Sequence, residues 1–140
     1  MQLNRGRIWL GGLAGGVVWN LWSFLIYHYI TGARYAVAQN AVFFLKTPRY
    51  PFFVGQWTLL LFILAIAVSH LYAWSRQTLG PGPGSALKVG FLVGFFTGFP
   101  ENFAQATWFA GDRGLPFGWM IEMWLGAILA GLVAGWLYKD

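Results

Sequence analysis

The sequence contains no cysteine and few charged residues. The absence of cysteine excludes disulfides, thiolate metal sites and cysteine nucleophiles. Charged residues make up 9% of the chain, and only four are acidic, whereas about a quarter of an average soluble domain is charged. The chain also lacks an H-E-x-x-H, a G-x-S-x-G and a phosphate-binding glycine loop. These absences favour a non-enzymatic protein, and an enzyme acting on a lipid or quinone ranks last among the alternatives.

Apolar and aromatic residues dominate what is present. The apolar fraction is 58%, the mean hydropathy is +0.57, and nine tryptophans contribute to an aromatic fraction of 20%. Helices that face lipid must be apolar on their outer side, and tryptophan gathers at membrane interfaces. The composition therefore predicts an integral membrane protein. Aromatic packing against pigments or ring cofactors is the less favoured explanation.

Four windows are long enough to cross a bilayer as helices, at residues 8–30, 53–75, 87–110 and 117–138. A spanning helix needs about 20 mostly apolar residues. Strands are excluded, because the windows show no alternation of polar and apolar residues and are too long for barrel strands. The sequence thus predicts an all-α, four-helix membrane bundle with a single domain over residues 1–140.

The connections fit this organisation. The aromatic stretch Tyr35–Leu45 precedes prolines 48 and 51 and is expected to form a short helix on the membrane surface. Gly-Pro-Gly-Pro-Gly at residues 80–84 predicts a turn, after which Ser85 would cap the third helix. Residues 8–30 are too long for the apolar core of a signal peptide, so we interpret them as a retained first helix.

Basic residues lie at the helix ends, which is typical of topology signals and lipid contacts and not of a nucleic-acid surface. With both termini cytoplasmic, five basic residues fall inside and four outside. The inner set is Arg5, Arg7, Arg76, Lys88 and Lys139, and the outer set is Arg34, Lys46, Arg49 and Arg113. Because this difference is small, the prediction of cytoplasmic termini depends on Arg5 and Arg7, which flank the first helix.

Glycine and alanine recur at four-residue spacing on three of the predicted helices. Such rows form grooves in which helix backbones approach closely, and this contact drives helix association in lipid. The sequence predicts tight packing of these three helices, with residues 53–75 more peripheral. Packing within the chain is favoured over packing against a partner. The rows are Gly11, Gly12, Gly15 and Gly16, then Gly90, Gly94 and Gly98, then Ala127, Gly131 and Gly135.

Several polar residues fall at one depth, in the leaflet away from the termini. They form a candidate site for a small ligand, a proton or a cation, and no metal set is assigned. Residues 98–102 would be a broken helix lining a small cavity. A structural role is favoured over this site: Glu101 would pair with Asn20 or His28, and Glu122 would reach the interface. Contact of these residues with a partner chain is the third interpretation. The candidates are Asn20, His28, Gln56, Glu101, Asn102, Gln105 and Glu122.

The two histidines are expected near opposite membrane faces, with His28 outside and His70 inside. They are too far apart to be the two axial ligands of one haem, so a bis-histidine haem is disfavoured. Ligation of a pigment by either histidine alone is less favoured than a hydrogen bond to lipid or backbone.

The chain resembles a group of small bacterial four-helix membrane proteins of unknown function. The resemblance rests on Trp19-Asn20, on residues 80–87, on residues 126–131 and on residues 135–139. It implies the same fold and a bacterial origin, but no activity, and we expect the chain in the bacterial inner membrane. The near absence of residues outside the predicted helices, the aromatic surface and the absence of catalytic motifs favour an accessory or structural subunit of a larger membrane complex, such as a respiratory or photosynthetic one. A binding or transport protein acting as a homo-oligomer is the alternative, and the partners are lipid, other membrane subunits or further copies.

Overall fold

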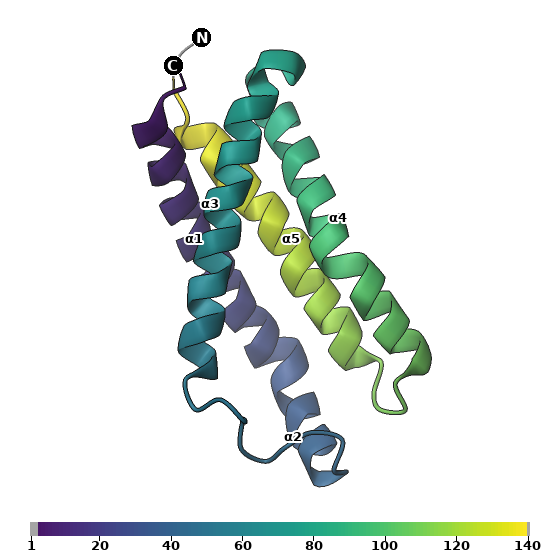
Figure 1. Ribbon diagram of the computed structural model, residues 1–140. Coiled ribbons are helices and arrows are strands. Elements are labelled where there is room, and N and C mark those ends of the chain that lie inside the picture. Colours follow the sequence, from purple (N-terminus) through teal and green to yellow (C-terminus); the bar gives the residue numbers. More distant parts are fainter. Residues whose placement is uncertain (1–2, 140) are drawn as a thin grey trace.

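The computed structural model describes residues 3–139, and every regular element in that range is a helix, with no strand (Figure 1). Four long runs of helix are joined by short connections. The elements are α1 (Arg5–Ile26), the π-helical segment η1 (Tyr27–Thr31), α2 (Gly32–Asn40), α3 (Phe53–Leu79), α4 (Pro83–Trp108) and α5 (Gly114–Leu137).

The first helix is longer than predicted. α1, η1 and α2 form one uninterrupted run, Arg5–Asn40, because no proline interrupts the chain before residue 48. The separate surface helix expected over Tyr35–Leu45 is therefore wrong. Its first half prolongs α1, and residues 41–52 form turns and irregular chain. At about 1.5 Å per residue the run is about 54 Å long, more than the ~30 Å of a hydrocarbon core.

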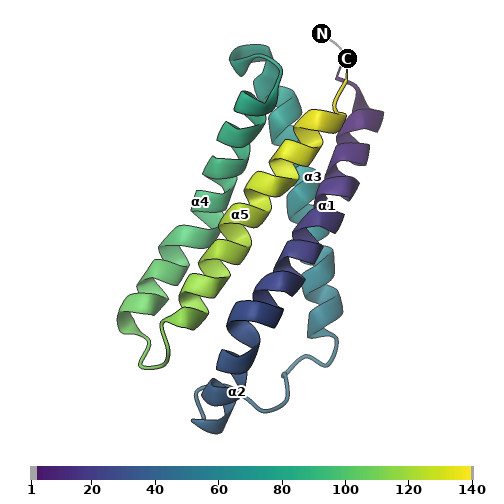
Figure 2. The same cartoon turned by 180° about the vertical axis from the view of Figure 1, so that it is seen from behind.

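The helices are arranged with α5 between α1 and α4, and α3 packs across them (Figures 1 and 2). α3 contacts all three other long helices, whereas α4 contacts α5 and α3 but not α1. α3 is nevertheless the least buried of the three runs that are long and apolar enough to cross a membrane, as expected for residues 53–75. Its enclosed face includes Leu61, Ala65 and Val68, whose side chains are at most 1% exposed.

The glycines of α1 serve two different neighbours. A Cβ added to Gly15 would lie 3.1 Å from the carbonyl oxygen of Ala130 on α5, and one on Gly12 would lie 2.7 Å from the Cα of Ile66 on α3. Gly11 repeats the first contact and Gly16 the second. One helix thus presents adjacent glycine rows to two partners within the chain, which lets both backbones approach closely.

The glycines of α4 lie against α5. A Cβ on Gly94 would lie 2.6 Å from the carbonyl oxygen of Trp124, and Gly90 and Gly98 make comparable contacts one turn away on either side. On α5, Ala127 is fully buried, and Gly131 and Gly135 both face Ala86 near the start of α4. These small residues hold α4 to α5 along most of its length.

The turn before α4 requires glycine at two positions, because Gly80 and Gly82 have φ values of +81° and +115°. The helix then begins at Pro83, a favoured first position for proline. Ser85 does not cap the helix as expected, and its hydroxyl donates to the carbonyl oxygen of Leu79, 3.1 Å away. α4 continues through Pro100 to Trp108, so the expected break at residues 98–102 is wrong.

Three helical runs are long and apolar enough to cross a membrane: Arg5–Asn40, Phe53–Leu79 and Gly114–Leu137. α4 has 26 residues, which is sufficient length. It is more polar, however, because its sequence includes Lys88, Glu101 and the amides Asn102 and Gln105. Its ability to span a membrane stays a prediction.

Candidate functional site

Glu122 on α5 is the most enclosed acidic side chain in the described chain, with 7% of its surface exposed. Its Oε1 accepts hydrogen bonds from the Ser23 hydroxyl on α1 and from the Trp57 indole N–H on α3, the latter 3.0 Å long. One carboxyl oxygen therefore joins three helices. We call Glu122, Ser23 and Trp57 the Glu122 cluster.

Two further tryptophans tie α1 to the backbone of α5 beside this cluster. The indole N–H of Trp19 donates to the carbonyl oxygen of Glu122, and that of Trp22 donates to the carbonyl oxygen of Ile121, each at 3.2 Å. Trp19 is completely buried, and its ring occupies the space that a side chain at Gly126 would take. These bonds fix the rotation of α1 and α5 about their axes, and so hold Ser23 against Glu122.

The surroundings of Glu122 are polar but uncharged. Both groups that donate to Oε1 are neutral, and no lysine, arginine or histidine forms a salt bridge with the carboxyl group within residues 3–139. Oε2 receives no hydrogen bond from the same residues. An ionised carboxyl group is costly to bury without a counter-charge. Chemically the cluster can act as a structural hub, or it can take up a proton or a small cation.

Glu101 lies elsewhere, on an exposed face of α4. Its Oε1 accepts a 3.1 Å hydrogen bond from the side-chain amide of Gln105, one turn later. Asn102 is buried beside it and donates to the carbonyl oxygen of Gly98 at 2.8 Å. Glu101 therefore does not pair with Asn20 or His28, and Glu122 is buried among the helices and not directed outward.

The remaining candidates are dispersed. Asn20 donates to the carbonyl oxygens of Gly16 and Thr58, linking α1 to α3. His28 is exposed on η1, where its ring contacts Phe24 and Tyr29. Gln56 is exposed at the start of α3. Of the seven sequence candidates, hydrogen bonds join only Glu101 and Gln105 to each other.

The partners of Glu122 were not among the residues predicted from the sequence. Ser23 follows Asn20 by three residues and so lies on a neighbouring part of the same helical face, and Trp57 adjoins Gln56. Hydroxyl and indole donors at the depth of a buried acid are a usable signal. The decisive information is helix rotation, which spacing alone does not supply.

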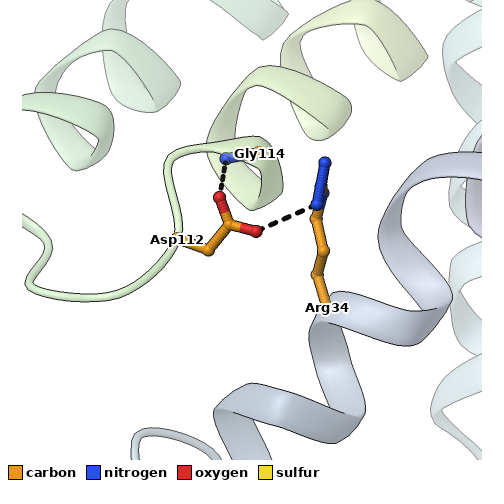
Figure 3. Close-up of polar contacts among 3 residues, drawn as sticks. All are labelled: Arg34, Asp112 and Gly114. Atoms are coloured by element: carbon orange, nitrogen blue, oxygen red, sulfur yellow. Dashed lines mark hydrogen bonds and ion pairs between the residues drawn. The ribbon is translucent and has the colours of Figure 1, made fainter.

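The end of the molecule that is remote from the termini carries a second polar group (Figure 3). The Arg34 guanidinium on α2 forms a 2.9 Å ion pair with Oδ2 of Asp112, and Oδ1 of Asp112 accepts a 2.8 Å hydrogen bond from the Gly114 N–H. Nearby, the Trp119 indole donates to the Tyr35 hydroxyl at 2.6 Å. Both contacts join α2 to α5 or to the loop before it, and they fix the extended first helix in place.

The cofactor hypotheses concern the two histidines. His70 on α3 makes a 2.9 Å contact through Nδ1 with the carbonyl oxygen of Ile66, and its ring lies between those of Trp9 and Trp74. A backbone contact of this kind is what the sequence favours for an interfacial histidine. No three His, Cys, Asp or Glu side chains within the described residues group to hold a metal ion.

A groove of about 360 Å³ on α4 and α5 has wholly apolar walls. It is separate from the Glu122 cluster and offers no hydrogen-bonding group to a polar substrate. The lining residues are Phe91, Met120, Ile121, Trp124, Leu125 and Ile128.

No known protein family, curated protein or solved structure matches this chain.

Proposed function

We propose that the chain is an integral membrane protein whose four long helices form a bundle across the bilayer, and that it acts as a small non-enzymatic subunit of a larger membrane assembly. Three helical runs have the length and hydropathy for this. The fourth, α4, is held against α5 by glycine contacts along its length, so it would accompany α5 through the bilayer.

The exposed Glu101 carries the proposal of a partner. It lies seven residues before the end of α4, about 10 Å along the helix axis and therefore inside the hydrocarbon region of a spanning helix. A charged group at the centre of a spanning helix costs about 2.5–3.5 kcal/mol on insertion scales. Gln105 supplies one hydrogen bond and no counter-charge. A neighbouring membrane chain that covers this face of α4 would remove the exposure.

The enclosed interior supports a structural role. The interhelical contacts are made by small residues and by hydrogen bonds between tryptophans and backbone carbonyl groups. The apolar groove carries no polar group that could orient a reacting substrate. This arrangement suits a protein that positions other chains.

The test is solubilisation of the native membrane in mild detergent, followed by native gel electrophoresis, mass spectrometry and an absorption spectrum of the band that contains the chain. Co-migration with other membrane subunits or in a multi-copy assembly supports the proposal, and a coloured band would point to a respiratory or photosynthetic complex. Migration as a single chain under all mild conditions would contradict it.

A second candidate function is the binding of a proton or a small cation at Glu122. The observation that favours it is the buried carboxyl group whose Oε2 has no donor within the described chain. Thermal unfolding of the wild type and of Glu122→Gln across pH and sodium concentration tests it. A dependence that is present in the wild type and lost in the variant supports binding, whereas parallel curves would reject it.

A further inference from the structure

Two polar groups on the outer surface have binding capacity that the described chain does not use. Glu101 accepts one bond from Gln105 through Oε1, and its Oε2 receives none from residues 3–139. The His28 imidazole makes ring contacts with Phe24 and Tyr29, and neither of its nitrogens has a hydrogen bond within the same residues. One group is an acceptor and the other a donor, so they are complementary.

Glu101 and His28 lie at nearly the same depth, as judged by the residues of α5 that lie level with each of them. On α4, Gly98 contacts Met120 of α5, and because the helices are antiparallel, Glu101 three residues later is level with about residue 117. On the other side of α5, Ile30 and Thr31 contact Gly118, and His28 lies two to three residues before them. The depths of Glu101 and His28 therefore differ by no more than about one helical turn, or about 5 Å.

The two groups cannot meet within one molecule. α1 with its η1 continuation and α4 lie on opposite sides of α5, and α1 makes no contact with α4 (Figure 2). In a membrane, however, copies of one protein share a single orientation. Groups at equal depth on opposite sides of the molecule are then positioned to meet between neighbours.

We propose that the face of α4 that carries Glu101 docks the outer face of α1 and η1 of a second copy, with the His28 imidazole donating to the Glu101 carboxylate. The inference rests on the proposed function, because it names the membrane chain that covers α4. The contact joins two different faces and is therefore heterologous, so it generates a ring or a chain of copies in place of a two-fold dimer.

The residues around His28 suit such a contact. The outer strip of α1 consists of exposed apolar side chains, among them Val17, Leu21 and Phe24, with His28 as its polar member. His70 differs, because its Nδ1 already contacts a backbone carbonyl oxygen and its ring lies between two tryptophans. A hydrogen bond to an ionised carboxylate is about twice as strong as a neutral one, and lipid offers no competing water.

The absence of cysteine makes a direct test possible. Glu101→Cys and His28→Cys chains, each with a different tag, are produced together in the native membrane and oxidised, and cross-linked species are separated on a non-reducing gel. We expect disulfide-linked dimers that contain both tags, and a ladder of larger species from the double variant. The matched control, His70→Cys with Glu101→Cys, should give no cross-link because its sites lie at opposite ends of the fold.

The single variants decide the geometry, because a heterologous contact never brings two copies of one position together. Cross-linking of Glu101→Cys to itself would indicate a two-fold contact and would overturn the inference. In a separate experiment, a His28→Ala variant that keeps its fold should self-associate about ten-fold more weakly than the wild type, as expected for the loss of one charge-assisted hydrogen bond. An unchanged association constant would also overturn it.

The experiment separates this inference from the proposed function. A fluorophore on Glu101→Cys is exposed to lipids with brominated acyl chains, which quench only probes that contact lipid. Without a cross-link, a protected probe would mean that a different protein covers α4, so the inference fails and the proposed function stands. A quenched probe without a cross-link would overturn both.

Discussion

Single residues at helix contacts carry much of the specificity of this fold, and Glu122 is the clearest case. Its carboxyl group gathers donors from α1 and α3, and the Trp19 indole is bonded to its backbone carbonyl oxygen. Loss of the carboxyl group would leave the Ser23 hydroxyl and the Trp57 N–H without an acceptor. Leaving buried donors without an acceptor lowers the free energy of unfolding more than removing an exposed polar side chain does.

Glu122→Ala is expected to lower the free energy of unfolding by about 1–3 kcal/mol, because two enclosed donors lose their acceptor. Glu122→Gln retains an acceptor oxygen and should lose less. Thermal unfolding in detergent measures both. The control is Gln56→Ala, which removes an exposed side chain next to Trp57. Equal effects at residues 122 and 56 would contradict the role assigned to the Glu122 cluster.

Gly94→Ala is expected to destabilise the α4–α5 contact by about 1–3 kcal/mol, the usual cost of overpacking. The added Cβ would lie 2.6 Å from a backbone oxygen and 2.8 Å from a Cα atom of Trp124, neither of which can move aside freely. Gly55→Ala is the matched control, since a Cβ there meets nothing within 4 Å. The ratio of folded to aggregated protein is measured for both variants after mild heating. An equal ratio for Gly94→Ala and Gly55→Ala would show that α4 does not pack against α5 as described.

At the scale of elements, the continuation of α1 into α2 is the least expected feature of the fold. α2 lies beyond the π-helical segment and is held by Arg34 and Tyr35 to the start of α5 and the loop before it. Asp112 in that loop has two functions, because one oxygen binds Arg34 and the other receives the N–H of Gly114 at the first turn of α5 (Figure 3). The position of the loop before α5 and the start of α5 therefore depend on the same side chain, Asp112.

Asp112→Ala should lower stability more than Arg34→Ala. Both atoms of the ion pair belong to half-exposed side chains, and such pairs contribute up to about 1 kcal/mol, whereas loss of a bond to the first turn of a helix adds about 1 kcal/mol more. A double-mutant cycle in detergent isolates the pairwise part. If Arg34→Ala lowered stability more than Asp112→Ala, the ion pair, and not the hydrogen bond to Gly114, would be the larger contribution of Asp112 to stability.

For the whole molecule, the first and last residues that the structure describes lie side by side. The backbone N–H of Asn4 donates to the Tyr138 hydroxyl, and the Asn4 side-chain amide donates to the carbonyl oxygen of Lys139. Four membrane-crossing helices would give this arrangement, with the loop at residues 41–52 on the opposite side.

Topology reporters test this organisation in living cells. A fluorescent protein that folds only in the cytoplasm should be active at either terminus, as the distribution of basic residues predicts. An alkaline phosphatase fused after residue 46 should be active only on the other side. Opposite results for the two termini would show that one of the four helices, with α4 the first suspect, does not cross.

The sequence by itself determined that the chain forms four long helical segments with small-residue rows on three of them, because both follow from composition and spacing along one chain. Residues 53–75 lie within α3, residues 117–137 lie within α5, and the predicted glycine rows all lie at helix contacts. Spacing could not reveal that Ser23 and Trp57 meet Glu122, that Glu101 remains outside, or that α1 and α4 do not contact each other. Those outcomes depend on how each helix is rotated and which neighbour it selects. Only the tertiary structure decided them, because each helix carries more than one face suited to packing and the packing of all four together selects which is used.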